Sequence, residues 1–119
     1  MEVAAGQTRV DDKVMWWFSG RCRSCDMQVE SDGEAPMPDE YRDLILRSSG
    51  HYGVHVLNRS AMSLNVIRKA TLRSVADISP LELPGLVATG TETEMRLLYD
   101  NLVANGLNQS EVELRLAPP

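Results

Sequence analysis

GTETEMRLLYDNLVANGLNQSEVELRL, residues 90–116, is the stretch whose pattern most clearly predicts the fold of this chain. Thr91 and Glu94 form a T-x-x-E capping box, in which each side chain satisfies a free backbone N–H at the start of a helix. An apolar stripe at helical spacing follows, and Gly106 occupies the position of a C-terminal cap. The stripe consists of Met95, Leu98, Leu102 and Val103. The stretch therefore predicts one amphipathic helix that ends near Gly106.

The end of the same stretch, EVELRL, predicts a strand. Its apolar residues Val112, Leu114 and Leu116 alternate with three charged residues, which is typical of a strand with one buried face. A helix and a strand thus close the chain.

Residues 52–88 supply the other elements of the same domain. YGVHVLN predicts a short strand, and SLNVIRKATLRSV predicts a helix over residues 63–75 with Ser63 as its N-cap. ISPLELP, residues 78–84, predicts a short helical turn broken by prolines, and a strand follows near residues 86–88. Residues 51–119 are therefore expected to form an α+β fold, a three-stranded antiparallel sheet with helices on one face in the order β-α-α-β-α-β.

The first 50 residues predict a β-hairpin and one helix. Residues 1–13 are polar without a period and are expected to form a flexible tail. VMWWFSGRC and DMQVES predict two strands joined by a turn that contains both cysteines, and DEYRDLILRSSG predicts a helix stopped by Gly50. We expect this cysteine-bearing hairpin and helix, residues 14–50, to pack with residues 51–119 as one compact unit.

Composition indicates a globular protein and excludes some partners. The chain has 119 residues, 43% of them hydrophobic, and a net charge of -5. An acidic surface repels a phosphate backbone, so we expect no nucleic-acid binding and a partner protein that is neutral or basic. No window approaches the roughly 18 apolar residues of a membrane span, and no signal-peptide pattern is present. The predicted location is therefore cytoplasmic.

Cys22 and Cys25 leave three interpretations open. A Cys-x-x-Cys turn between two strands resembles a zinc-knuckle hairpin, but a structural zinc needs four ligands. On an extended strand, His51 and His55 would lie roughly 13 Å apart, so at most one of them could join the cysteines. A redox site would place the first cysteine at a helix start, and no helix follows here. The third interpretation is a pair of reduced packing thiols, so zinc is a possible cofactor and no other is indicated.

Nothing in the sequence predicts an enzyme. His51 and His55 have no serine or third cysteine in a nucleophile context, and the glycines form no phosphate-binding loop. Trp16 and Trp17 are adjacent in a predicted strand, so one of the two rings faces away from the other. That ring is either covered by the rest of the protein or serves as an anchor for a partner.

The order of elements over residues 53–116, with the segments VHVLN, NVIRKA and GTETEMRLLYDNLVANGLNQSEVELR, resembles the C-terminal domain of the bacterial ribosomal stalk protein. The protease adaptor of the Clp system is similar at this level. In the stalk family, a valine-rich strand leads to a helix with a V-I-K-x-V-R-like segment. The second helix of that family is represented here only by ISPLELP, and its N-terminal dimerisation segment is replaced by the cysteine hairpin. The resemblance implies that Arg68 and Lys69 lie where the family contacts translation factors.

These observations together predict a non-enzymatic bacterial module for protein–protein interaction, either an adaptor or a binder of the immunity-protein type. Its expected partner-binding residues are Arg68, Lys69, Arg73, Trp16 and Trp17. The alternative is a zinc-binding protein whose Cys22 and Cys25 hold a structural or redox-responsive metal. The sequence does not specify an oligomeric state.

Overall fold

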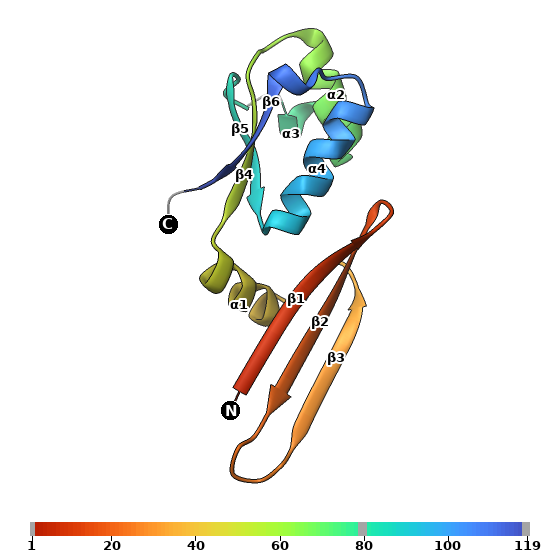
Figure 1. The fold of residues 1–119 in the computed structure, drawn as a ribbon. Helices are drawn as coiled ribbons and strands as arrows, with labels where there is room; N and C mark the ends of the chain where they lie inside the picture. The colour runs from red at the N-terminus through yellow and green to blue at the C-terminus, as the bar shows by residue number, and fades with distance from the viewer. Residues whose placement is uncertain (1, 79–80, 118–119) are drawn as a thin grey trace. The chain divides into compact units, whose positions relative to one another are not determined.

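A computed structural model describes residues 2–78 and 81–117 of the chain, which divides into two compact units, Met1–Gly50 and His51–Pro119 (Figure 1). The predicted α+β class is confirmed, with a three-stranded antiparallel sheet in each unit. The prediction of a single compact unit for residues 14–119 is wrong, because each half builds its own sheet. The two units are described separately below.

The unit Met1–Gly50 is a meander of three strands followed by a helix. Its elements are β1 (Glu2–Val10), β2 (Lys13–Arg21), β3 (Gln28–Glu34) and α1 (Asp39–Ser49). The central strand β2 pairs antiparallel with β1 and with β3. The predicted hairpin around the cysteine turn is therefore present as β2 and β3, and Gly50 caps α1 as expected.

The flexible tail predicted for residues 1–13 is instead strand β1 and the turn that follows it. β1 pairs with β2 over its whole length, from Glu2 opposite Arg21 to Val10 opposite Lys13. The two strands are joined at Asp11 and Asp12, and Asp11 has a φ of 55°, a conformation that aspartate adopts more readily than most residues. The segment EVAAGQTRV lacks an apolar alternation, so its strand character comes from its pairing with β2.

The two tryptophans of β2 explain how glycine is tolerated in both outer strands. A Cβ atom on Gly6 would lie 2.6 Å from the ring of Trp17, and one on Gly33 would lie 3.1 Å from the ring of Trp16. Each indole thus covers a backbone segment that has no side chain of its own. β3 consequently continues through Gly33 to Glu34, beyond residue 31, where the sequence pattern had placed its end.

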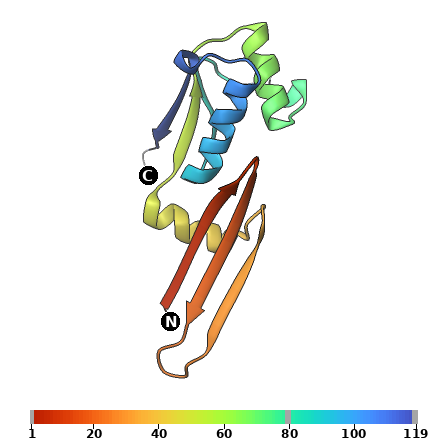
Figure 2. The same cartoon turned by 45° about the vertical axis from the view of Figure 1, so that its right-hand side comes forward.

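The unit His51–Pro119 has its own sheet and helices. Its elements are β4 (Tyr52–Val56), α2 (Ala61–Thr71), α3 (Val75–Ile78), β5 (Gly85–Gly90), α4 (Glu92–Ala104), the 3-10 helix η1 (Gln109–Glu111) and β6 (Val112–Leu116). The strand order is β5-β4-β6, with antiparallel pairing throughout and an irregularity between Val54 and His55. Figure 2 shows α4 running alongside the central strand β4. Contacts of α4 with β4, β5 and β6 hold this helix on the sheet.

The core of this unit joins the sheet to α2 and α4. Val54, Val56, Ile67 and Leu102 are fully buried in one apolar cluster. Met95 lies in the same cluster, and the predicted capping box of α4 forms both of its hydrogen bonds. Burial of these side chains fixes the position of α2 relative to β4.

Helix α2 starts and ends earlier than predicted. Its N-cap is Ser60, and Ser63 is the third residue of a Ser60–Ser63 capping box. The helix ends at Thr71, followed by Leu72 as C-cap. The predicted helical turn over residues 78–84 includes residues 79 and 80, which lie outside the described residues. Within the described residues, no helix combines the length and apolar character needed to cross a membrane.

We expect Leu102→Ala to lower the free energy of unfolding by about 2–5 kcal/mol, because the vacated volume in a packed core is not refilled. Leu116→Ala is the matched control, since Leu116 is 62% exposed, and its effect should stay within about 0.5 kcal/mol. Urea denaturation followed by circular dichroism measures both. Equal effects of the two substitutions would contradict the assigned core.

Candidate functional site

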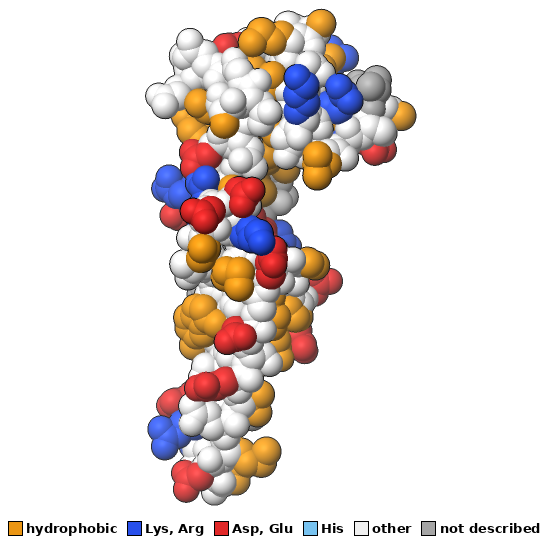
Figure 3. All heavy atoms as spheres, turned by 90° about the vertical axis from the view of Figure 1, so that its right-hand side faces the viewer, with side chains coloured by type: hydrophobic (Ala, Val, Ile, Leu, Met, Phe, Trp, Pro, Cys, Tyr) orange, Lys and Arg blue, Asp and Glu red, His pale blue; other side chains and the backbone are white. Residues whose placement is uncertain are grey.

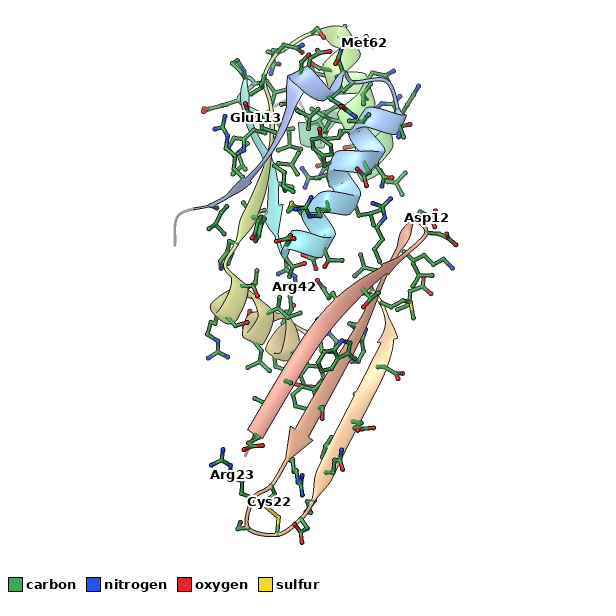
Figure 4. The ribbon with its side chains drawn as sticks, in the orientation of Figure 1. Asp12, Cys22, Arg23, Arg42, Met62 and Glu113 are labelled. Atoms are coloured by element: carbon green, nitrogen blue, oxygen red, sulfur yellow. A yellow bond between two sulfur atoms is a disulfide. The ribbon has the colours of Figure 1, made fainter. Side chains whose placement is uncertain are left out.

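The two cysteines are joined by a disulfide at the tip of the β2–β3 hairpin. The Cα atoms of Cys22 and Cys25 are 5.6 Å apart, and the backbone N–H of Cys22 donates to the carbonyl of Met27 at 2.8 Å. Cys22 is half-buried and Cys25 is exposed. Figure 4 shows Cys22 in the turn that joins β2 to β3. Of the three interpretations left open for Cys22 and Cys25, the one with reduced packing thiols does not describe this structure, in which neither sulfur is a free ligand.

Charged side chains surround this disulfide without forming a metal site. A pocket of about 310 Å³ is lined by Cys22 together with Glu2, Arg21, Arg23 and Asp26. Nε of Arg23 donates to Oε1 of Glu2 at 2.8 Å, so that carboxylate is already paired. Among the residues that the structure describes, no three or more His, Cys, Asp or Glu side chains are grouped to hold a metal ion. A metal at the reduced cysteines would need further ligands from outside this turn.

His51 and His55 lie in the other unit. His51 is exposed just before β4, and the half-buried His55 lies on β4 itself. Nδ1 of His55 is buried without a hydrogen-bond partner among the described atoms. The structure therefore does not bring either histidine together with the cysteines in one compact unit.

Trp16 and Trp17 lie on opposite faces of β2 because consecutive side chains of a strand alternate. The ring of Trp16 lies 5.9 Å from that of Tyr41 of α1, and Phe18 stacks on Tyr41 at 4.1 Å. The Trp16 indole also donates to the carbonyl of Glu34 at 3.1 Å. Trp16 is thus engaged within its own unit, whereas Trp17 is 44% exposed and is the ring that a partner could contact.

The three predicted cations gather at the end of α2. Arg68 and Lys69 lie in its last turn, Arg73 follows two residues after its end, and all three are exposed. Between them, Leu72 is 92% exposed and has a φ of 56°. Arg68 also donates to Oδ1 of Asn65 at 3.0 Å. Figure 3 shows Lys and Arg side chains beside apolar ones on this unit.

The predicted binding residues therefore form two surfaces in separate units. We name the group Arg68, Lys69, Leu72 and Arg73 the α2-end patch. Leu72 was missed because the sequence pattern continued the helix to residue 75, whereas α2 ends at Thr71 and leaves Leu72 as its left-handed C-cap. A second missed feature is the row of three carboxylates at alternate positions of β3, Glu30, Asp32 and Glu34, which matters only once the strand reaches Glu34.

A polar cluster links α4 to the central strand of its unit. The Tyr52 hydroxyl donates to Glu92, and this hydrogen bond is the main reason why the pKa of Glu92 lies below its ordinary value and that of Tyr52 lies above. Nε of Arg96 donates to Oε1 of Glu92 at 3.1 Å. Because the cluster joins the first turn of α4 to β4, we assign it a structural role.

Comparison of the chain with protein-family models, with curated proteins and with solved structures finds no match. The resemblance to the ribosomal stalk domain therefore stays a prediction, and the function is argued below from the two surfaces.

We expect Tyr52→Phe to raise the pKa of Glu92 toward 4.5, because the phenylalanine cannot donate a hydrogen bond to the carboxylate. A lowered pKa in the folded state stabilises the protein above the pKa of the unfolded state, and this contribution is lost as the pH falls through the folded value. The variant should therefore lose less stability than the wild type on acidification. NMR titration of the Glu92 carboxyl measures the shift.

Tyr99→Phe is the matched control, because Tyr99 lies on α4 but is not among the causes of the Glu92 shift. An unchanged Glu92 titration in Tyr52→Phe would contradict the assigned hydrogen bond.

Proposed function

We propose that this chain is a non-enzymatic protein-interaction module of the adaptor or immunity-protein type, and that the α2-end patch contacts a partner protein. The observation that carries the proposal is Leu72, which is 92% exposed in a left-handed conformation between cationic residues. A leucine in this conformation costs roughly 1–2 kcal/mol, and glycine is the usual residue at the end of a helix. Leu72 therefore lowers the stability of the fold, but its exposed side chain is well placed to contact a partner protein.

The residues around Leu72 define the chemistry of its partner. Arg68, Lys69 and Arg73 flank the exposed apolar Leu72 along the chain, so we expect the complementary surface to have an apolar pocket rimmed by carboxylates. Placing cations near a helix C-terminus also complements the helix dipole, which accounts for Arg68 and Lys69 but not for the exposure of Leu72.

The fold adds support to this proposal. Figures 1 and 2 draw α2 and α4 on the same side of the sheet of the unit His51–Pro119, which is the arrangement expected if helices cover one face and present their outer surface to a partner. The stalk-domain resemblance implies a factor-contacting role for Arg68 and Lys69, the same two residues that belong to the α2-end patch.

The second proposed function is a metal-binding turn formed by Cys22 and Cys25 after reduction. The observation in its favour is that both sulfurs lie in one hairpin turn and that Cys25 is exposed, so a reductant and then a metal can reach them. Two thiolates supply half of a tetrahedral zinc site. The remaining ligands would come from a partner or from a second copy of the chain.

For the first proposal, we expect Leu72→Gly to raise the free energy of unfolding by about 1 kcal/mol, because glycine adopts positive φ without strain. The same substitution should weaken partner binding, and replacement of Arg68, Lys69 and Arg73 by alanine should weaken it further. Cross-linking in host lysate with purified chain, followed by mass spectrometry, identifies proteins joined near residues 68–73.

The matched control is Leu116→Ala, which removes another exposed leucine from the same unit and should retain every cross-linked partner. If the same proteins were captured after all four residues of the α2-end patch had been replaced, the proposed surface would be wrong.

For the second proposal, the reduced chain should bind zinc with a stoichiometry of about one ion per chain or per two chains, and Cys22→Ser should abolish that binding. Metal analysis after reduction and gel filtration measures it. Ser24→Ala is the control, because Ser24 lies within hydrogen-bond distance of the Cys22 sulfur, at 3.3 Å, without being a thiolate ligand. Equal zinc content in the wild type and Cys22→Ser would exclude this site.

A further inference from the structure

Strand β3 carries three carboxylates on one face of the sheet in the unit Met1–Gly50. Glu30, Asp32 and Glu34 are exposed and occupy alternate positions, so their side chains point to the same side at intervals of about 7 Å. In the register with β2, Asp32 is directly opposite Trp17. Residues opposite one another in an antiparallel pair share a face. The carboxylates therefore line the face that presents Trp17.

The other face of this sheet is occupied by side chains from α1. Tyr41 stacks on Phe18 and lies beside Trp16. The side chains of Trp16 and Phe18 point to the face opposite Trp17, because they precede and follow Trp17 directly in the strand. On the Trp17 face, the indole lies across Gly6 and remains 44% exposed. Figure 3 shows Asp and Glu side chains next to apolar ones along this unit. This face thus combines an exposed aromatic ring with a row of negative charge.

The backbone of β3 is open to pairing on one side. In the strand order β1-β2-β3, β3 is an edge strand, and β2 is the one element with which it makes extensive contacts among the described residues. An exposed edge can accept a further strand. Like charges at alternate positions oppose pairing with a second copy of the same strand, whereas a strand with cations at alternate positions meets opposite charges across the new pair.

Two of the three carboxylates have local partners, and the middle one does not. Lys13 lies 3.7 Å from Glu34, and Gln28 donates to Glu30 at 3.0 Å. Among the described residues, no hydrogen bond or ion pair joins the Asp32 side chain to another side chain, whereas its backbone pairs with β2 opposite Trp17. A lysine or arginine placed opposite Asp32 would therefore meet a carboxylate that is not already paired with another side chain.

The charge of this unit favours the same kind of partner. Residues 1–50 contain ten acidic and six basic side chains, against seven and six in residues 51–119, so most of the net negative charge lies in the first unit. Long-range attraction of a basic segment is therefore directed to this unit rather than to the one that carries the α2-end patch.

We propose that the outer edge of β3 is a docking strand for an extended segment of a partner protein with lysine or arginine at alternate positions. The segment adds as a fourth strand, and its cations pair with Glu30, Asp32 and Glu34. This inference rests on the proposed function only in that the ligand is a protein, because it uses a different surface in a different unit.

The test uses the full chain and a seven-residue peptide with lysines at positions 2, 4 and 6 separated by threonine and valine. A permuted peptide of the same composition, with its three lysines adjacent, has the same charge but the wrong spacing. We expect the alternating peptide to shift the backbone amide signals of β3, with affinity at least about tenfold higher than that of the permuted peptide. N-methylation of alternate backbone nitrogens in the alternating peptide should abolish binding, because it removes strand donors.

Asp32→Asn should weaken binding of the alternating peptide by about two- to fivefold, the scale of one exposed ion pair. Glu40→Gln is the matched control, since it removes the same charge from an exposed site on α1 and should leave affinity unchanged. Replacing Glu30, Asp32 and Glu34 together by their amides should remove binding while circular dichroism shows an intact fold.

The proposal is overturned if the two peptides bind equally, if the N-methylated peptide binds as well as its parent, or if Glu40→Gln weakens binding as much as Asp32→Asn. Each of these results would mean general charge attraction rather than strand addition. Leu72→Gly should bind the alternating peptide with unchanged affinity. A negative result in the peptide test therefore does not contradict the proposal for the α2-end patch, and a negative result for the patch does not contradict the proposal for β3.

Discussion

The pairing of β4 on both of its edges is the constraint on which the unit His51–Pro119 depends. β5 and β6 satisfy the backbone of β4 on either side, so its side chains are held in place when helices pack over them. Val54 and Val56 are fully buried, together with Ile67 of α2 and Leu102 of α4. Because Ile67 anchors the middle of α2, the end of that helix is fixed relative to the sheet. The α2-end patch is exposed as a direct result.

A different constraint organises the unit Met1–Gly50. Trp16 and Trp17 are consecutive residues of a strand, so they cannot share a face. Tyr41 of α1 engages Trp16 and Phe18, and this packing leaves the Trp17 ring on the open face. The sheet alternation also places Asp32 on the Trp17 face. The aromatic packing that holds α1 and the exposure of Trp17 are thus two results of the same alternation.

Local sequence patterns allowed the clearest helices and strands to be predicted. Long-range pairing and packing account for the places where the structure differs from the prediction. The capping box at Thr91 and the strand after η1 follow from nearby residues alone. Strand β1 could not be predicted because its small and polar residues become a strand only when β2 lies alongside. The conformation of Leu72 depends on the residue at which α2 ends, and packing of the core decides that residue. The disulfide depends on the redox state around Cys22, which the spacing of the two cysteines does not specify.

The two proposed surfaces carry opposite charges and belong to separate units, an arrangement that would let an adaptor hold two different partners. Each unit has its own sheet, and the edge of β3 and the α2-end patch belong to different sheets. Two independent sites in one chain raise the effective concentration of one partner near the other without any contact between those partners. The distinction between an adaptor and a binder of one protein therefore depends on whether both surfaces are occupied at the same time, rather than on the affinity of either surface alone.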